Sequence, residues 1–339
     1  MNDKQGLLHF SSSFLLSYLQ ESILLSIFEV IMISVALCTF NGEKFLLKQL
    51  NSILCQSVPV DEIVVCDDCS TDSTWQILEQ YAAQSQKIRL FQNSHNLGYL
   101  ANFEKALKLC QGDYIFLSDQ DDIWRPDKVA ESVGYLSKSG MYGAFSDGRI
   151  IDEYGELTGL TLFKLQNLKP YIQKGILQKH MFGVLCMKKN FVTGATLVLT
   201  QKGKEMVLPF RSSDLFIHDG WIALKLSAYG KFGFINMPLI DYRIHSGQQL
   251  GLNFNPPKDF IAECFDDEAD IKQLMRIRRR YGALSKACGF GGKEGRLVFR
   301  TYYELWKKNH SKGISGLHEG LLFLLTELFV ILKLDNSRF

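Results

Sequence analysis

The chain has 339 residues, 46% of them hydrophobic, and a formal net charge of +2. This length is enough for one large α/β domain with an appendage. The near balance of acids and bases excludes the strong basic excess that is typical of nucleic-acid-binding proteins, so we expect no nucleic-acid partner. The eight cysteines are scattered, mostly in apolar runs, as expected of reduced and buried thiols. Cys66 and Cys69 have the CxxC spacing, but no second Cys or His pair matches them, so we predict no zinc site there.

Residues 1–31 precede the first predicted strand. The stretch Phe14–Val30 is apolar but interrupted by Gln20, Glu21 and Glu29, and it has neither a basic leader nor a small-residue cleavage site. It therefore matches neither a signal peptide nor a membrane span. Three interpretations stay open, namely a non-native upstream extension, an amphipathic helix, and an ordinary extra helix of the domain.

The next part of the chain alternates short apolar runs with segments of helical periodicity. We predict strands over Ile33–Thr39, Glu62–Cys66, Ile88–Phe91 and Tyr114–Ser118, and helices over Lys44–Leu54, around Trp75–Tyr81 and over Leu100–Leu109. Ser73 and Gln76 have the spacing of a capping box, which predicts the start of the second helix. Short strands separated by ten-residue helices indicate a parallel, doubly wound sheet, in which ligands bind beyond the carboxyl ends of the strands.

Polar clusters fall at those strand ends, over Thr39–Asn41, Asp67–Asp68 and Asp119–Asp122. Asp119 and Asp121 directly follow an apolar strand, so both carboxylates emerge at one rim of the sheet. Mg²⁺ and Mn²⁺ bind oxygen ligands and commonly bridge one or two carboxylates to substrate phosphates. The alternative for this cluster is a solvated turn. The second cluster could accept a hydrogen bond from a base or a ribose, or it could be an Asx cap of the following helix.

Four motifs occur in a fixed order, over Ser34–Glu43, Ile63–Thr74, Asn96–Gly98 and Gly112–Trp124. With these motifs, residues 31–250 resemble the inverting glycosyltransferases of family 2, which have the GT-A fold. The resemblance implies a Rossmann-like, doubly wound and mostly parallel α/β sheet over residues 32–252. Within it, residues 32–125 would bind the nucleotide and residues 126–252 the acceptor. Residues 253–339 would form a helical C-terminal extension.

The resemblance also implies roles for individual residues. The implied nucleotide pocket consists of Thr39, Asn41, Glu43, Asp68, Asn96 and Gly98. The implied metal ligands for Mg²⁺ or Mn²⁺ are Asp119, Asp121 and His245, with Asp121 the more direct ligand and His245 completing the metal shell or contacting the diphosphate. The implied substrate contacts are Asp122, Trp124, Gly194, Trp221 and Arg243. For Arg243 a structural ion pair is the alternative to offsetting phosphate charge. Cys69 departs from the family, which more often has glycine in this turn.

The acceptor half contains the sequence His218-Asp219-Gly220-Trp221 at the start of a helical run. Inverting transfer needs a general base that takes the proton of the acceptor hydroxyl. By resemblance this base is Asp219, although the family more often has an aromatic residue where Gly220 stands here. The alternative is that Asp219 is a simple helix N-cap.

Within the family, the sequences of three segments are most similar to bacterial rhamnosyltransferase-type members, which build O-antigen, capsule or related polysaccharides. These segments are Ser118–Trp124, Asn190–Gly194 and Tyr242–Gly247. The resemblance implies a hexosyltransferase that uses dTDP-rhamnose or a UDP-sugar and a glycan or polyprenyl-linked acceptor. Two alternatives stay open. A nucleotidyltransferase would normally carry a glycine-rich phosphate loop with a basic residue, which Thr39–Glu43 lacks. Against a non-catalytic sugar-binding relative stand the intact acidic residues at the predicted metal and base positions.

After residue 252 the character of the chain changes. Pro256 and Pro257 mark a boundary, and the remainder is predicted to be helical. Arg276 and Arg278–Arg280 form a basic cluster, and Leu317–Leu334 is apolar but interrupted by charged residues. An apolar helix preceded by basic residues can lie on an anionic membrane surface. We therefore expect a cytoplasmic protein with peripheral contact to the inner face of the membrane. The alternative is a helix packed on the catalytic domain with its arginines in water.

Overall fold

The structure is a computed structural model and describes residues 31–187, 190–211, 216–248, 270–298 and 300–301. The predictions for residues 1–30 and for Leu317–Leu334 lie outside the described residues. In the described part of the chain, no helix is long and apolar enough to cross a membrane.

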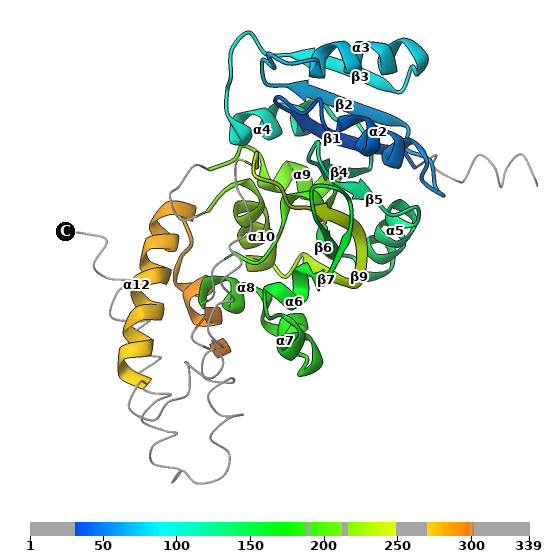
Figure 1. The fold of residues 1–339 in the computed structure, drawn as a ribbon. Helices are drawn as coiled ribbons and strands as arrows, with labels where there is room; N and C mark the ends of the chain where they lie inside the picture. The colour runs from blue at the N-terminus through cyan, green and yellow to red at the C-terminus, as the bar shows by residue number, and fades with distance from the viewer. Residues whose placement is uncertain (1–30, 188–189, 212–215, 249–269, 299, 302–339) are drawn as a thin grey trace, which may run out of the picture.

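The first half is a parallel sheet with connecting helices. The strands are β1 (Ile33–Thr39), β2 (Glu62–Asp67), β3 (Ile88–Gln92) and β4 (Tyr114–Ser118), in the order β3-β2-β1-β4 (Figure 1). The helices are α2 (Leu46–Leu54), α3 (Thr74–Gln84) and α4 (Tyr99–Leu109). β1 and β2 are buried at every position, as expected of parallel strands covered on both faces. The predicted bounds of the four strands and of α2 and α4 are confirmed to within two residues.

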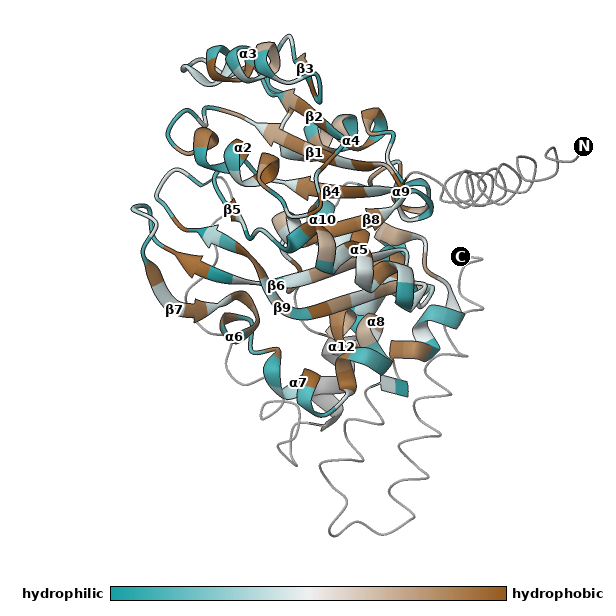
Figure 2. Ribbon diagram, turned by 90° about the vertical axis from the view of Figure 1, so that its right-hand side faces the viewer, coloured by the Kyte–Doolittle hydropathy of each residue, from teal (hydrophilic) through white to brown (hydrophobic). Residues whose placement is uncertain are grey.

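The second half adds antiparallel pairs to the same sheet. β8 (Leu197–Thr200) runs antiparallel to β4 and to β6 (Gly143–Ile151). β9 (Phe232–Arg243) runs parallel to β6 and antiparallel to β5 (Ile123–Trp124), while β7 (Leu157–Thr161) pairs with β6. The strands of the described residues therefore form one sheet that extends through both halves. Its central strands β1, β2 and β4 are mainly hydrophobic, as Figure 2 shows.

Helices enclose the second half. They are α5 (Lys128–Ser139), α6 (Leu162–Leu165), α7 (Lys169–Gln173), α8 (Ile176–Met187), α9 (Gln201–Val207), α10 (His218–Ala228) and α12 (Asp270–Cys288), and a 3₁₀ turn, η1, spans Gly194–Thr196. α12 packs on α8, which packs on α10 (Figure 1). Arg280 of α12 lines a small cavity with Leu185 and Leu224, and burial lowers the pKa of its guanidinium. This member of the predicted basic cluster therefore points toward the catalytic domain and not into water, so for Arg280 the expectation of an arginine on a wet helix face was wrong.

The start of α3 differs from the predicted capping box. The Ser73 side chain makes no capping hydrogen bond. Instead, the carboxylate of Glu43 accepts a hydrogen bond from the Ser73 N–H at 2.9 Å, and Asp72 accepts one from the Thr74 N–H at 3.0 Å. The capping-box prediction was wrong because a carboxylate thirty residues upstream satisfies the free N–H. The loop after β1 is thereby fixed to the loop after β2.

Candidate active site

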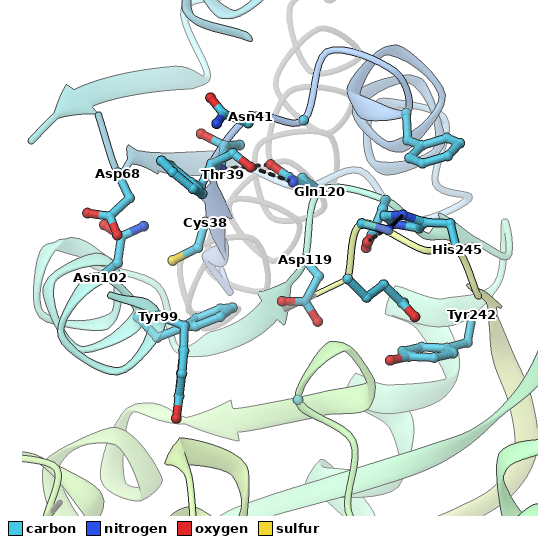
Figure 3. Close-up of a pocket in the computed structure, with 18 of the residues that line it drawn as sticks. Cys38, Thr39, Asn41, Asp68, Tyr99, Asn102, Asp119, Gln120, Tyr242 and His245 are labelled. Atoms are coloured by element: carbon cyan, nitrogen blue, oxygen red, sulfur yellow. Dashed lines mark hydrogen bonds and ion pairs between the residues drawn. The ribbon is translucent and has the colours of Figure 1, made fainter. Parts of the chain in front are cut away.

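A cavity of about 560 Å³ lies at the carboxyl ends of β1, β2 and β4. Figure 3 shows Thr39, Asn41 and Asp68 along one part of its wall and Asp119, Tyr242 and His245 along another. The predicted site residues that line it are Thr39, Asn41, Asp68, Asp119, Asp121, Gly194, Asp219 and His245. The fold thus brings together side chains from both halves, separated by up to about two hundred positions in the sequence.

The loops after β1 and β2 are held in tight conformations that shape the nucleotide side of the cavity. The Asn41 side-chain oxygen accepts a hydrogen bond from the Thr71 N–H at 2.8 Å, and the Asn41 N–H donates to the Ser70 hydroxyl at 2.9 Å. Asn41 and Cys69 have positive φ angles of 49° and 64°. The left-handed conformation costs a non-glycine residue roughly 1–2 kcal/mol, a cost that the glycine implied at position 69 by the family resemblance would avoid.

Asp68 organises the next loop and still faces the cavity. Its carboxylate accepts hydrogen bonds from the Leu97 N–H at 2.7 Å, the Gly98 N–H at 2.9 Å and the Asn93 amide at 2.8 Å. An ionised carboxylate has about four acceptor sites, so one remains for a ligand. The neighbouring Asp67 accepts hydrogen bonds from the turn after β2. Its Oδ2 accepts one from the Ser70 N–H at 3.0 Å. The Asx-type role therefore belongs to Asp67.

Three of the six predicted nucleotide contacts do not line the cavity. Glu43 caps α3, as described above. Asn96 accepts a hydrogen bond from the Gly98 N–H at 2.9 Å, and Gly98, with a φ of 80°, precedes the first residue of α4. These residues hold the loops that carry Asn41 and Asp68.

The metal side of the cavity carries excess negative charge. Burial, and then Asp121 and Asp219, raise the pKa of Asp119 to about 7, while the Lys128 ammonium lowers it. The Asp121 carboxylate lies 2.8 Å from Nε2 of His245. A divalent cation would offset this charge. Among the described residues, no three His, Cys, Asp or Glu side chains form a complete metal cage. Mg²⁺ and Mn²⁺ usually bind through one or two carboxylates together with substrate phosphates, so the residues present fit such an ion.

Three of the predicted substrate contacts lie behind the cavity wall, namely Asp122, Trp124 and Arg243. Asp122 is buried and accepts a hydrogen bond from the Arg243 N–H at 3.0 Å. The fully buried Arg243 donates from Nε to the Asp121 carbonyl at 2.8 Å, and its guanidinium lies 4.7 Å from the centre of the Phe45 ring. Trp124 is buried in the core, where its ring packs against Phe116. None of the three lines the cavity, and Arg243 holds the backbone of the acidic loop instead of facing a phosphate.

Of the two remaining predicted substrate contacts, Trp221 lies outside the cavity lining and Gly194 lies within it. Trp221 donates from its indole N–H to the Val207 carbonyl at 2.7 Å and is buried outside the cavity lining. Gly194 lines the cavity, and a Cβ atom at this position would lie only 2.8 Å from Nε2 of His218. The absence of a side chain at Gly194 leaves room for that imidazole.

Asp219 lies in the first turn of α10 and is 6% exposed. One carboxylate oxygen accepts hydrogen bonds from the Asn190 amide at 2.8 Å and from the Gly220 N–H at 2.5 Å. Burial raises the pKa of Asp219 to about 7, against the lowering effect of these hydrogen bonds. A carboxylate with such a pKa is suited to general-base chemistry near neutral pH. The residue before the helix is Ile217, so Asp219 is not its N-cap.

The absence of a side chain at Gly220 also has a structural reason. A Cβ atom there would lie 2.9 Å from Cβ of Phe216 and 3.4 Å from the Asn190 side chain. An aromatic residue, which related sequences more often carry at this position, would displace the asparagine that holds Asp219.

Gln120 lines the cavity, and the sequence assigned it no role. Its side chain accepts a hydrogen bond from the Phe40 N–H at 2.8 Å and donates one to the Phe40 carbonyl at 3.0 Å (Figure 3). A Cβ atom on Gly42 would overlap the Gln120 amide. Asn190 and Tyr242 were likewise within quoted motifs but carried no assignment. Their contacts join distant positions, which leaves no signal in local spacing.

Comparison with known proteins agrees with this architecture. Residues 34–188 match the model of the family described as glycosyl transferase family 2. An uncharacterized glycosyltransferase of Haemophilus influenzae is 32% identical over 251 residues, which cover 73% of this chain and 75% of that one. WfaP of Escherichia coli, named as a UDP-Glc:α-D-GlcNAc-diphosphoundecaprenol β-1,3-glucosyltransferase, is 25% identical over 68% of this chain and 84% of its own length. For two further relatives the match spans only about half of their length, 45% and 52%.

The fold has a counterpart among solved structures. The crystal structure of TarS from S. aureus with UDP-GlcNAc superimposes with a TM-score of 0.53 at 17% identity, over 89% of this chain and 81% of that one. At this identity the likeness shows the shared GT-A fold alone. Together with the family match and the extended similarity to the Haemophilus protein, it means that the chain belongs to glycosyltransferase family 2.

Proposed function

We propose that this protein is an inverting, metal-dependent glycosyltransferase that moves a sugar from a nucleotide-sugar donor to a glycan or polyprenyl-linked acceptor. The observation that carries the proposal is the shared cavity. Asp219, a buried carboxylate whose pKa is raised to about 7, lies on the same cavity as Asp119 and Asp121 and as the polar loops after β1 and β2.

The donor would lie along the strand ends. Asn41 and Asp68 offer polar atoms to the nucleoside, with Thr39 beneath them, where its hydroxyl donates to Asp67 at 2.8 Å. Asp119 and Asp121 would hold Mg²⁺ or Mn²⁺, with His245 beside them. Such an ion supplies neutralisation of the charge that develops on a nucleoside diphosphate leaving group.

Asp219 would act as the general base. Its carboxylate takes the proton of the acceptor hydroxyl as the oxygen attacks the anomeric carbon, and the nucleoside diphosphate departs from the opposite face. The bond to the diphosphate breaks as the new glycosidic bond forms, so the anomeric configuration inverts. Asn190 orients the carboxylate through the 2.8 Å hydrogen bond.

Donor and acceptor can be proposed more closely. The motifs similar to rhamnosyltransferase-type members support dTDP-rhamnose, whereas the name of WfaP supports a UDP-sugar and a diphosphoundecaprenol-linked acceptor. A polyprenyl-linked acceptor would place the protein in the cytoplasm at the inner face of the membrane. The product would enter a bacterial cell-surface polysaccharide such as O-antigen or capsule.

The decisive experiment incubates the protein with UDP-glucose, UDP-GlcNAc and dTDP-rhamnose in the presence of Mn²⁺ and measures release of the nucleoside diphosphate. We expect release from one class of donor, increased by an acceptor glycan. Release of pyrophosphate from a nucleoside triphosphate and a sugar phosphate would instead indicate a nucleotidyltransferase. Binding of the nucleotide sugars without any release, with or without acceptor, would indicate a sugar-binding relative.

A further inference from the structure

Tyr242 lies in the second half of the chain and lines the cavity. Neither the motifs nor the proposed mechanism assign it a role. It lies near the end of β9, where it pairs in register with Ile150 of β6. The side chain is 7% exposed and lines the cavity. In Figure 3 its ring lies near His245, and its hydroxyl points into the cavity on the side of Asp119. Because a paired strand holds it, the position of this hydroxyl is well defined.

The hydroxyl has no hydrogen-bonding partner among the described residues, whereas its sequence neighbours are heavily bonded. Arg243, on the opposite face of β9, reaches the backbone of the acidic loop. His245 pairs with Asp121. A hydroxyl that faces a polar cavity and has no protein partner is available for a hydrogen bond with a ligand in that cavity.

The other residues of the cavity wall locate that ligand. Asp119, Asp121 and Asp219 line the same cavity as Tyr242. Burial, and then the charges of the neighbouring carboxylates, raise the pKa of Tyr242. The tyrosine therefore shares the cavity with the predicted metal ligands and the predicted base. In an inverting transfer, the sugar that moves must occupy this space, since its anomeric carbon is bonded to the diphosphate and is attacked by the oxygen that Asp219 deprotonates.

A sugar hydroxyl both donates and accepts hydrogen bonds. Carboxylates that are ionised can pair with the protons of sugar hydroxyls but not with their lone pairs. On the side of the cavity where Asp119 lies, the protonated phenol of Tyr242 offers a donor to such a lone pair. We propose that the Tyr242 hydroxyl donates a hydrogen bond to a hydroxyl oxygen of the transferred sugar, and that it contributes to the choice of donor sugar. This inference rests on the proposed function.

The test is Tyr242→Phe, which removes one oxygen atom and no described hydrogen bond. Calorimetry in Mn²⁺ compares two ligand pairs, UDP-glucose with UDP and dTDP-rhamnose with dTDP. For the sugar nucleotide that the wild type uses, we expect Kd to rise about three- to tenfold, the effect of one neutral hydrogen bond. The Kd of the matching diphosphate, which lacks the sugar, should stay unchanged. The matched control is Tyr229→Phe, at an exposed tyrosine directly after α10. It should change neither the Kd of the sugar nucleotide nor that of the diphosphate.

Monodeoxy versions of the same sugar nucleotide identify the hydroxyl. With the wild type, one of them should lose the same three- to tenfold affinity, and Tyr242→Phe should cause no further loss with that analogue. Equal weakening of the sugar nucleotide and the diphosphate would overturn the inference in favour of a diphosphate contact. An unchanged donor Kd with a raised acceptor KM would overturn it in favour of an acceptor contact. A lowered melting temperature with unchanged binding would make Tyr242 structural.

The experiments distinguish a failure of the proposed function from a failure of the role of Tyr242. If the wild type releases no nucleoside diphosphate from any of the sugar nucleotides, the proposed function fails and this inference fails with it. If the wild type turns over a donor and Tyr242→Phe retains wild-type affinity for it, only the role of Tyr242 is wrong.

Discussion

Replacing Asp219 by asparagine should lower activity and raise stability at the same time. Asparagine has the same size, and its side-chain oxygen can still accept the hydrogen bonds of Asn190 and the Gly220 N–H. Only the basicity is lost. We expect sugar transfer to fall by roughly a hundred- to ten-thousand-fold, the usual contribution of a general base. Binding of the nucleotide sugar should stay near the wild-type value, since this carboxylate is not needed to hold the donor.

The gain in stability follows from the pKa of Asp219. Burial raises it from 3.8 to about 7 in the folded protein, so the folded state holds a proton that the unfolded state has released between these pH values. Wild-type stability from this group is therefore lost as the pH rises from about 4 to 7, and the loss amounts to about 4 kcal/mol above pH 7. At pH 5 the loss is about 2 kcal/mol by the same relation. The asparagine variant carries no such penalty.

The assay is denaturant unfolding of both proteins at pH 5 and at pH 8, together with a radiolabel transfer assay and donor calorimetry. The stability advantage of Asp219→Asn should be about 2 kcal/mol larger at pH 8 than at pH 5. Glu156→Gln, the same exchange at an exposed position, is the control and should show no pH-dependent advantage. An equal advantage at both pH values would refute the buried-carboxylate reasoning. Near-normal transfer would remove Asp219 from the mechanism, and loss of donor binding would make it a structural residue.

Three further predictions concern residues that line the cavity or support its wall. Asp121→Ala should abolish turnover and weaken Mn²⁺-dependent nucleotide binding in calorimetry, and EDTA should have the same effect on the wild type. Gly42→Ala should displace the Gln120 amide and raise the donor KM by as much as about thirtyfold, since two hydrogen bonds of about 1 kcal/mol each hold the loop after β1. Asn190→Ala removes a hydrogen bond that lowers the pKa of Asp219, so the acid limb of the kcat/KM profile should move to higher pH.

Each of these predictions has a contrary outcome. Full activity in EDTA would contradict the metal-dependent mechanism. For the loop, the double variant with Gln120→Ala should be less than additive, and simple additivity would show that the two positions act independently. For Asn190→Ala, a limb that moves to lower pH, or one whose position depends on the Mn²⁺ concentration, would assign the titration to the metal-binding carboxylates instead.

The sequence alone was sufficient for the first half of the fold. β1 and β4 begin and end where the apolar runs do, and the polar clusters at their ends lie on the cavity. This succeeded because a parallel sheet covered on both faces requires continuous apolar strands, and chain direction then places every strand end at one edge. The position of Asp219 at the start of a helix, on the cavity, also agrees with the sequence, because its motif is local; its role as the base stays a prediction.

Tertiary structure alone decided which of the motif residues reach the cavity. Arg243 and Trp124 belong to the same motifs as His245 and Asp121, yet they are buried and do not line the cavity. Because successive side chains of β9 point to opposite faces, Tyr242 lines the cavity and Arg243 does not. The antiparallel pairing of β8 was likewise not predictable, since an apolar run indicates burial but carries no strand direction. Glu43 and Gln120 act through hydrogen bonds to loops thirty and eighty residues away. Such contacts depend on how the chain returns to the sheet edge, and no spacing within a motif records them.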